Sequence, residues 1–414
     1  RAARRFEESL KNLLVPGILF EEMGFRYFGP IGGHEIGPMV DAFRNLLNLE
    51  GPVLIHMVTK KGLGYKFAEE CPEKFHSAPP FDVETGAKRV TLDGKVQFEK
   101  GETYTNVFGE AMIELAGKDD KIIAITAAMP DGTGLSKFAE KFPKRFFDVG
   151  IAEQHAIGFA SGLAKGGLKP VCAIYSTFLQ RAYDQIVHDV CLQDANVVFC
   201  LDRAGLVGED GPTHHGLFDI AYLRHIPKIA VMAPSGAEEL KLMLEFAVNY
   251  EGPISIRYPR GEEVIFPVEK PLAPIELGRA QVVKEGKDAA VLAFGSMVGL
   301  GVAAAKLLKA EGTDVSVINA RFAKPLDEGL LQDLSKKTKV FITLEEGVED
   351  GGFGSAVLEF FEKENIKNIF VKRIGLPDEF IEHGARESLF RKFNLTPEGI
   401  RDITREAIAC QRSR

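Results

Sequence analysis

The sequence lacks several features that would each indicate a particular class of protein. Its apolar runs fall short of the roughly 18–20 residues that a membrane-spanning helix needs, and no secretory signal is recognisable. Its formal net charge is −8 and its pI is about 5.7, so no overall positive charge favours a nucleic-acid surface. We therefore expect no membrane span and no nucleic-acid partner. A local basic pocket for an anionic small molecule stays open.

Cysteine is scarce, with five residues in 414, and no two of them have the CxxC spacing of a metal or redox motif. Cys172, Cys191 and Cys200 lie in apolar segments, which is typical of buried free thiols. Because unpaired cysteines fit a reducing compartment, we expect a cytoplasmic protein, or a plastid protein if the source is a plant.

The chain is long enough for several domains, at about 100–200 residues per domain. A polar, glycine-containing stretch and a proline-rich stretch read as linkers, at residues 81–103 and 266–278. They separate three blocks of alternating helical and strand patterns, at residues 1–80, 104–265 and 279–414. Alternation at this spacing predicts consecutive α/β domains with mainly parallel sheets.

The first block is expected to be incomplete, because the chain opens on RAARRFEESL without a first strand. Amphipathic helical patterns follow, and then a short apolar run, Val53–Val58, predicts a buried parallel strand. In the second block, KPVCAIYS predicts a strand and residues 178–193 predict a single helix.

Glu153 lies at the start of a predicted helix, within the small and apolar segment FDVGIAEQHAIGFASGLA. One interpretation is structural, because an acidic residue in the first helical turn interacts favourably with the helix dipole. The other is functional, because a carboxylate in apolar surroundings is costly unless it is paired or used. In open α/β sheets, functional residues gather where strands end and helices begin, which favours the second interpretation.

The segment AIYSTFLQRAYDQ places Tyr175, Phe178 and Arg181 three residues apart, just beyond a predicted strand. That spacing brings them to roughly one face of a helix start. An aromatic stripe facing the core would explain Phe178 but not Arg181.

A glycine-rich loop follows the next strand, in LDRAGLVGEDGPTHHGLFD, and carries Asp210, His214 and His215. Metal binding, a flexible active-site loop and an incidental surface loop are the alternatives. No cysteine or HxH pattern supports a metal, so we favour the active-site loop.

Arginines also follow predicted strands, with Arg203 after one and Arg257 and Arg260 in IRYPRG after another. The planar guanidinium fork can pair with two phosphate oxygens, so these residues are candidates for a phosphate site. The glycine-rich turn EDGGFGSAV, residues 349–357, either binds an anion or supplies glycines for helix packing.

Several of these segments occur in one order along the chain and together resemble the 1-deoxy-D-xylulose-5-phosphate synthases, a thiamine-diphosphate-dependent family of the transketolase superfamily. STFLQRAYDQIVHDV and DGPTHHG separate this family from ordinary transketolases. The others are GPIGGHE, TKKGLGY, FHSAPPF, DVGIAEQHAIGFASGLA, YPRGE and LEEGVEDGGFGSAV. The resemblance implies decarboxylating condensation of pyruvate with D-glyceraldehyde 3-phosphate to 1-deoxy-D-xylulose 5-phosphate, a precursor of isoprenoids, thiamine and pyridoxal.

The resemblance also implies roles for residues that match the family's cofactor site. Glu153 would contact the aminopyrimidine N1′ of thiamine diphosphate and share its proton, and Phe178 would stack on that ring. Tyr65, in the TKKGLGY segment, would contact the cofactor. His76 and His214 would lie near the reacting carbon.

A second group of residues matches the family's substrate site. Tyr175, Arg203 and Arg260 would hold the phosphate of D-glyceraldehyde 3-phosphate, with Asp210 close by. Arg181 would lie beside this site, next to the cofactor.

The sequence departs from the family in two places. Gly33 stands in GPIGGHE where the family usually has Asp. The Gly-Asp-Gly motif and the downstream Asn that hold Mg²⁺ and the diphosphate have no counterpart, so no metal ligand is assigned in this chain. The resemblance implies a remnant of the diphosphate-binding domain (1–80), a pyrimidine-binding domain (104–265) and a transketolase C-terminal domain (279–414). We therefore expect this chain to be the C-terminal two-thirds of the enzyme.

Partners and alternative functions follow from this expectation. The family implies a homodimer, and the missing motif leaves room for a separate N-terminal polypeptide. One alternative is the pyrimidine-binding half of a split transketolase. Another is a non-catalytic fragment or paralogue that pairs with a full-length partner.

Overall fold

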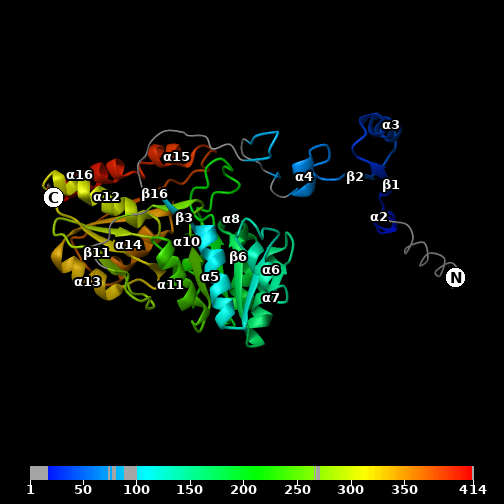
Figure 1. The fold of residues 1–414 in the computed structure, drawn as a ribbon. Helices are drawn as coiled ribbons and strands as arrows, with labels where there is room; N and C mark the ends of the chain where they lie inside the picture. The colour runs from blue at the N-terminus through cyan, green and yellow to red at the C-terminus, as the bar shows by residue number, and fades with distance from the viewer. Residues whose placement is uncertain are drawn as a thin grey trace. The chain divides into compact units, whose positions relative to one another are not determined.

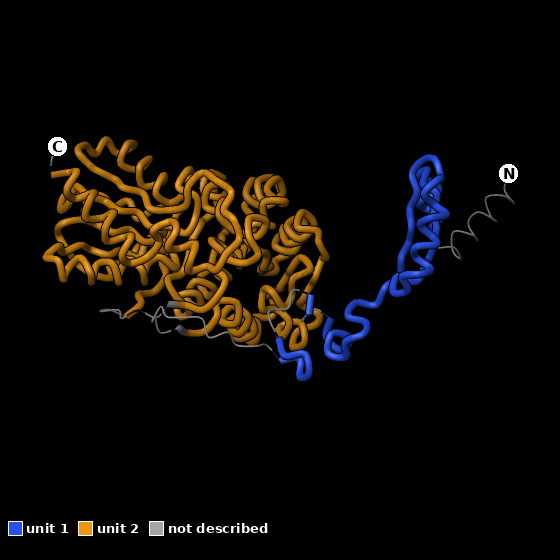
Figure 2. The backbone as a smooth tube through the Cα atoms, turned by 90° about the horizontal axis from the view of Figure 1, so that it is seen from above, with its two compact units in different colours: residues 1–96 blue, residues 97–414 orange. Residues whose placement is uncertain are grey.

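The backbone of the chain divides, in the computed structural model, into two compact units, residues 1–96 and 97–414 (Figure 2). The structure describes residues 17–72, 75–76, 81–87, 100–264, 266 and 271–412. The first unit contains α2 (Ile18–Glu22), β1 (Arg26–Gly32), α3 (Ile36–Leu46), β2 (Val53–Val58) and α4 (Lys66–Glu70) (Figure 1).

The second unit is built around two sheets, and the larger has seven strands in the order β14-β8-β9-β7-β6-β4-β5. Its pairs are parallel except for β14 with β8. The elements before the second predicted linker are β3 (Lys100–Thr103), α5 (Tyr104–Lys118), β4 (Ile122–Thr126), α6 (Ser136–Lys141), β5 (Phe146–Asp148), α7 (Glu153–Lys165), β6 (Lys169–Tyr175), α8 (Ser176–Leu179), η1 (Gln180–Ala182), α9 (Tyr183–Gln185), η2 (Ile186–Cys191), β7 (Val198–Asp202), α10 (Asp219–Arg224), β8 (Ala230–Met232), α11 (Ala237–Val248), β9 (Ile254–Arg257) and β10 (Glu262–Val264).

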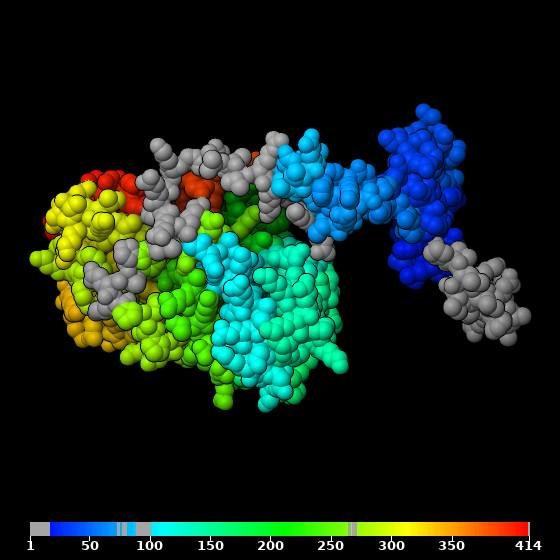
Figure 3. All heavy atoms as spheres, in the orientation of Figure 1, coloured from blue at the N-terminus to red at the C-terminus, as the bar shows by residue number. Residues whose placement is uncertain are grey.

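Strand β4 shows how this sheet is buried on both faces. Ile123 and Ile125 pack into the core that contains α7, whereas Ile122 and Ala124 pack into the core formed with α5, α6 and α11. Helix α5, cyan in Figure 3, forms part of the surface of the unit. Because both faces are covered, the central strands are continuous apolar runs rather than alternating ones.

The smaller sheet has five strands in the order β11-β13-β12-β15-β16, all parallel except β11 with β13. Helices α13 and α14 contribute to the core on one face, and α12 and α16 to the core on the other. The elements are β11 (Gln281–Lys284), β12 (Ala290–Ala293), α12 (Met297–Ala310), β13 (Ser316–Asn319), β14 (Phe322–Lys324), α13 (Glu328–Lys337), β15 (Val340–Val348), α14 (Phe353–Lys363), β16 (Phe370–Leu376), α15 (Arg386–Lys392) and α16 (Pro397–Arg412). The predicted fold class, consecutive α/β domains with mainly parallel sheets, is confirmed.

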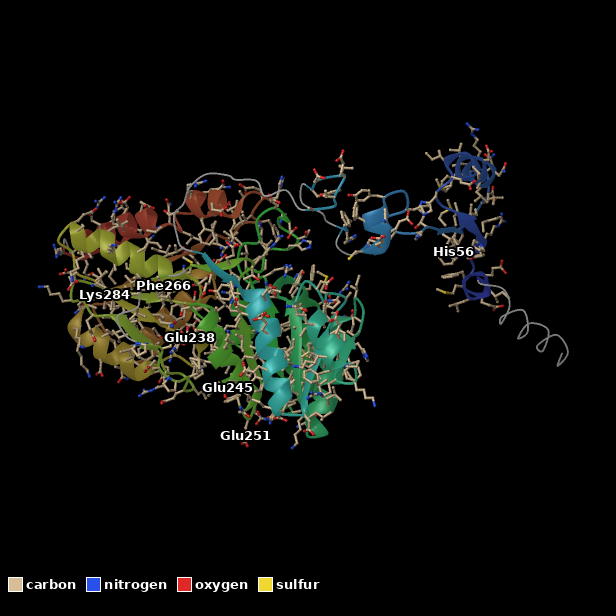
Figure 4. The ribbon with its side chains drawn as sticks, in the orientation of Figure 1. His56, Glu238, Glu245, Glu251, Phe266 and Lys284 are labelled. Carbon is tan, nitrogen blue, oxygen red and sulfur yellow. The ribbon has the colours of Figure 1, made fainter. Side chains whose placement is uncertain are left out.

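The two sheets belong to one unit, because a strand, an apolar core and a buried ion pair connect them. Strand β14 comes from the third predicted block but forms an edge of the seven-stranded sheet, and one apolar core contains residues of both sheets. Just before β14, Arg321 is 1% exposed and its Nε lies 2.7 Å from Glu239 Oε1 of α11. Phe266, labelled in Figure 4, packs on the core of the smaller sheet over Gly299.

Residues 178–193 do not form the single helix that their pattern predicts. The segment is divided into α8, the 3₁₀ turn η1, the short α9 and the π-helix η2. Within η2, the carbonyl of Asp189 accepts a hydrogen bond of 2.5 Å from the hydroxyl of Ser161 on α7. A side chain that takes up a backbone carbonyl in this way disturbs the regular helical ladder.

The first predicted linker is also partly structured, because its last residues form β3, which pairs antiparallel with β10.

In the first unit, the predicted strand Val53–Val58 forms with those bounds, as β2, but the prediction that it is buried is wrong. Among the described strands it pairs only with β1, and every residue of it is half-buried or exposed. His56 of β2, labelled in Figure 4, lies 2.6 Å through its Nδ1 from the hydroxyl of Tyr27. In the described part of this unit the sheet has only these two strands, so β2 lies at its edge instead of between neighbouring strands.

Candidate active site

The polar residues of interest lie where the central parallel strands of the larger sheet end. Tyr175 is the last residue of β6, and Arg203 directly follows β7. Helix α7 begins at Glu153, shortly after β5. In an open α/β sheet this carboxyl edge is where ligands bind.

An aromatic and cationic cluster forms at this edge from four of the predicted residues. The rings of Tyr175 and Phe178 stack with centroids 5.5 Å apart, and the guanidinium of Arg203 lies 3.8 Å above the Tyr175 ring. His214, from the glycine-rich loop, contacts Phe178 edge-on at 5.3 Å. Burial raises the pKa of Tyr175 to about 12, so its hydroxyl keeps its proton at neutral pH.

The orientation of Arg203 is fixed by hydrogen bonds that sequence reasoning did not foresee. Its Nη1 donates to the carbonyl of Gly132 at 2.6 Å and to Asp202 at 3.0 Å, and its backbone has a φ of +61°. Asp202 is fully buried and accepts a bond of 2.7 Å from the hydroxyl of Thr105. Burial raises the pKa of Asp202 to about 6, against the lowering effect of Arg203.

Gly132 is a site residue that sequence reasoning missed. A Cβ at this position would collide with the hydroxyl of Tyr175, so only glycine lets the loop pass so close to the ring. The available signal was the glycine-rich segment DGTG, residues 131–134, which directly follows a predicted strand.

Glu153 and Arg181 form a second group at this edge. Glu153 is 4% exposed, and its Oε2 lies 3.5 Å from Nη1 of Arg181. The guanidinium of Arg181 is largely exposed and extends from η1, which contacts α7. The carboxylate is thus buried as expected, with one cation at its margin.

The glycine-rich loop brings Asp210 and Arg260 together. Nη1 of Arg260 donates to the carboxylate of Asp210 and, at 3.3 Å, to the carbonyl of Val207. Both charged groups are partly exposed, so they are open to solvent and to a ligand. On the same loop, Nδ1 of His214 lies 2.9 Å from the hydroxyl of Thr213.

Arg257 does not belong to the phosphate site that its position suggested. It is buried, and its Nε lies 2.9 Å from Asp219. Its Nη2 donates to the backbone carbonyls of Glu346 and Gly216, at 2.9 and 3.4 Å. The guanidinium is used by the chain itself, because a buried charge needs a partner.

The turn EDGGFGSAV does not present free N–H groups to an external anion. Glu345 of β15 accepts hydrogen bonds from the backbone N–H groups of Phe353 and Gly354, at 2.7 and 2.8 Å, where α14 begins. The carboxylate of the chain therefore occupies the helix start, and the anion-binding interpretation of this turn is wrong.

Tyr65 and His76 lie in the first unit, and their predicted roles stay predictions. The hydroxyl of Tyr65 donates to the carbonyl of Val83 at 3.0 Å, and its ring packs against Phe81. His76 is exposed. Gly33, where the resemblance implied Asp, lies so close to the residue after β2 that a Cβ would be 2.5 Å from Thr59 Cγ2.

Two kinds of feature are absent from the described ranges. None of the helices there has the length and apolar character required to cross a membrane. In those same ranges, no three His, Cys, Asp or Glu side chains are grouped so as to hold a metal ion.

Three family models match the chain. A model described as 1-deoxy-D-xylulose-5-phosphate synthase matches residues 1–59. The transketolase pyrimidine-binding domain matches residues 100–263, and the transketolase C-terminal domain matches residues 278–400.

Whole-chain comparisons agree with these models. The 1-deoxy-D-xylulose-5-phosphate synthase of Heliobacterium modesticaldum is 50% identical over 414 residues, which are 100% of this chain and 63% of that protein. The 1-deoxy-D-xylulose-5-phosphate synthase 1 of Geobacter sulfurreducens is 49% identical over 99% of this chain and 63% of its own length. The chain thus spans less than two thirds of the curated relatives it matches.

A solved structure described as a split gene transketolase, inactive beta4 tetramer, is similar with a TM-score of 0.67 and 32% identity, over 75% of this chain and 99% of that chain. The family models, the sequence relatives and the fold agree, and the chain belongs to the transketolase superfamily and, within it, to the 1-deoxy-D-xylulose-5-phosphate synthase family.

Proposed function

We propose that this chain supplies the pyrimidine-binding and C-terminal parts of a 1-deoxy-D-xylulose-5-phosphate synthase. The enzyme would condense pyruvate with D-glyceraldehyde 3-phosphate, with loss of carbon dioxide, to 1-deoxy-D-xylulose 5-phosphate. The observation that carries the proposal is the cluster of Tyr175, Phe178, Arg203 and His214 at the carboxyl edge of the larger sheet. The relatives named above support the same reaction.

The residues at this edge fit the pyrimidine end of thiamine diphosphate. Glu153 offers a buried carboxylate at a rigid helix start, and Phe178 offers a half-buried ring for stacking. When bound, thiamine diphosphate supplies the electron sink for decarboxylation. Glu153 holds a proton at the pyrimidine N1′ atom, and burial strengthens that interaction by excluding water.

The acceptor substrate is proposed to bind through its phosphate. Arg203 and Arg260 supply guanidinium groups, and the hydroxyl of Tyr175 stays protonated and can donate. Asp210 pairs with Arg260 when no phosphate is present and orients its fork. His214, which contacts Phe178, is placed to donate to the carbonyl oxygen of a substrate held there.

We further propose that the diphosphate and Mg²⁺ are held by an N-terminal part of the enzyme outside these 414 residues, supplied by the same chain or by a separate polypeptide. Support comes from α3 and its C-cap residue Leu47, which together expose an apolar stripe at the helical spacing of Ile36, Val40, Phe43 and Leu47. Ile36 is 74% exposed and Leu47 is 79% exposed. The split gene transketolase offers a precedent for a chain of this extent. The assembled enzyme is proposed to be a homodimer.

The test is complementation with a polypeptide that carries the missing Gly-Asp-Gly motif, taken from the Heliobacterium modesticaldum relative. The mixture receives Mg²⁺, thiamine diphosphate, D-glyceraldehyde 3-phosphate and ¹³C-labelled pyruvate, and NMR follows labelled 1-deoxy-D-xylulose 5-phosphate. Glu153→Gln should lower turnover by about 10²–10⁴-fold, because it removes a group that exchanges protons. Glu238→Gln is the matched control, because Glu238 also lies in a first helical turn, on α11, but is exposed (Figure 4).

Two other outcomes would replace this proposal. Transfer of a ketol unit from xylulose 5-phosphate, without product from pyruvate, would identify the pyrimidine-binding half of a split transketolase. The split gene transketolase structure favours this alternative, because the similarity covers 99% of that chain. A stable complex without turnover on either substrate would identify a non-catalytic paralogue.

A further inference from the structure

The loop that carries Asp210 and His214 is attached to the C-terminal domain by a buried carboxylate. Glu346 of β15 is 1% exposed and accepts hydrogen bonds from the backbone N–H of Leu206 and from the hydroxyl of Ser296, both at 2.9 Å. Nη2 of Arg386, from α15, lies 2.9 and 2.8 Å from its two oxygens. Arg386 also donates through Nε to the carbonyl of Leu206 at 3.1 Å. Both backbone polar groups of Leu206 are therefore held by C-terminal side chains.

A second attachment passes through His215, to which the sequence resemblance gave no role. Its Nδ1 lies 3.1 Å from the backbone N–H of Val207, and its Nε2 lies 3.2 Å from the carbonyl of Glu382. An N–H can only donate and a carbonyl can only accept, so Nδ1 is the acceptor and Nε2 carries the proton. Burial lowers the pKa of His215, which favours this neutral form.

Glycines let the loop approach the C-terminal domain closely at two further points. A Cβ on Gly205, whose φ is +91°, would collide with the carboxyl group of Glu346. A Cβ on Gly211, whose φ is +73°, would lie 3.0 Å from the Cβ of His383. The contact along the loop is therefore continuous, and it does not depend on one side chain.

The two attachments hold the backbone at and beside Val207, the residue whose carbonyl orients Arg260. Leu206 is held by Glu346 and Arg386, and Val207 is held by His215. The carbonyl of Val207 accepts from Nη1 of Arg260 at 3.3 Å. A shift of this backbone segment would therefore move the guanidinium and the carboxylate of Asp210 that pairs with it.

We propose that the C-terminal domain sets the geometry of the phosphate site, with His215 and the Glu346–Arg386 pair as positioning residues. They touch no substrate and act through Val207 and Arg260. This inference rests on the proposed function, because it concerns the site for the phosphate of the acceptor substrate. It gives the C-terminal domain a task in substrate selection beyond packing against the larger sheet.

The test uses the full chain and an unreactive phosphomonoester, sn-glycerol 3-phosphate. His215→Leu removes both hydrogen bonds, whereas His215→Gln keeps an acceptor and a donor on one side chain. We expect His215→Leu to increase amide hydrogen exchange across residues 206–216 and to weaken glycerol 3-phosphate binding about tenfold, the loss of roughly one net hydrogen bond. His215→Gln should restore both within about threefold.

Two further variants complete the test. His225→Leu is the matched control, because His225 is exposed and also makes two polar contacts, with Tyr183 and the carbonyl of Ala221, but none with the loop. Arg386→Met provides a second break of the attachment that leaves His215 in place, should His215→Leu fail to fold. It should also weaken glycerol 3-phosphate binding.

The outcomes separate this inference from the proposed function. Faster exchange of the loop in His215→Leu and Arg386→Met with unchanged affinity for glycerol 3-phosphate would overturn the inference alone. Equal losses in His215→Leu and His225→Leu would overturn it as well. If the wild-type chain did not bind glycerol 3-phosphate at all, the phosphate site of the proposed function itself would be contradicted.

Discussion

Strands β2 and β4 have similar apolar sequences and parallel partners, but their surroundings differ. In β4, with the sequence IIAIT, every residue is buried, because β5 and β6 flank it and helices cover both faces. In β2, with the sequence VLIHMV, no residue is buried. An apolar run therefore predicts a strand, but the burial of that strand depends on neighbours from other parts of the chain.

The treatment of charge differs between the two units in the same way. The second unit buries complete ion pairs, such as Glu239 with Arg321 and Asp219 with Arg257. In the first unit, the pair Lys60–Glu69 is largely exposed on its lysine side. A buried charge is costly without its partner, so a buried pair fixes the two elements that carry it in one arrangement. An exposed pair contributes little to the free energy of unfolding.

The largest effect is expected where the two sheets of the second unit meet. Arg321→Met leaves the carboxylate of Glu239 buried without its cation and removes bonds to the carbonyls of Ala273 and Pro274. We expect the free energy of unfolding to fall by about 3–5 kcal/mol, measured by urea denaturation followed by circular dichroism.

The control for this variant is Arg405→Met, which breaks exposed pairs with Glu311 and Asp402 on the surface. It should cost less than about 1 kcal/mol. The double variant Glu239→Gln/Arg321→Met should recover part of the loss, because no uncompensated charge remains. Equal effects of Arg321→Met and Arg405→Met would show that the buried pair does not hold the two sheets together.

A matched pair of isoleucine variants tests the difference between the two strands directly. Ile125→Ala in β4, at a position that is 0% exposed, should lower the free energy of unfolding of the second unit by about 2–5 kcal/mol. Ile55→Ala in β2, at a half-buried position, should change the free energy of unfolding of the first unit by less than about 1 kcal/mol. Urea denaturation of both variants gives the comparison, and similar losses would contradict it.

Buried carboxylates give the second unit a dependence on pH. Burial raises the pKa of Glu345 from its ordinary 4.5 to about 7, and that of Asp202 from 3.8 to about 6. Each group binds its proton more tightly in the folded chain, so its contribution to the free energy of unfolding falls as pH rises from about 4 to about 7. Glu345 accounts for about 3 kcal/mol of this decrease.

Glu345→Gln should flatten the dependence between pH 4.5 and 7, whatever it does to stability at one pH. The measurement is the midpoint of urea denaturation at half-unit steps of pH. The same slope in Glu345→Gln as in the wild-type chain would show that folding does not raise the pKa of Glu345.

Much of the larger sheet could be predicted from sequence, because strands such as β4 and β6 are short apolar runs between helical patterns. The break in residues 178–193 could not, because it depends on the hydroxyl of Ser161, a residue on another helix. Strand β14 was also hidden, because its partner β8 lies ninety residues earlier in the chain. Local sequence patterns predict helices and strands, whereas strand pairing between distant parts of the chain determines their positions in the sheets.

The candidate site shows the same division. Tyr175, Phe178, Arg203 and His214 could be chosen from strand ends and motifs, and the structure brings them together. Arg257 has the same local context as Arg203 but is used in a buried ion pair, which only the fold reveals. Gly132 was missed because its role is the absence of a side chain beside Tyr175.

The smallest effect on stability is expected from Leu47→Ser, at the exposed end of the apolar stripe on α3. Leu47 is 79% exposed, so the free energy of unfolding of the chain alone should change by less than about 0.5 kcal/mol. The same substitution should weaken association with the N-terminal polypeptide used for complementation, by about tenfold if the leucine becomes buried there. Analytical ultracentrifugation of the mixture measures that association, and Glu238→Gln again serves as the control. Unchanged association would mean that the stripe on α3 is not covered by that polypeptide.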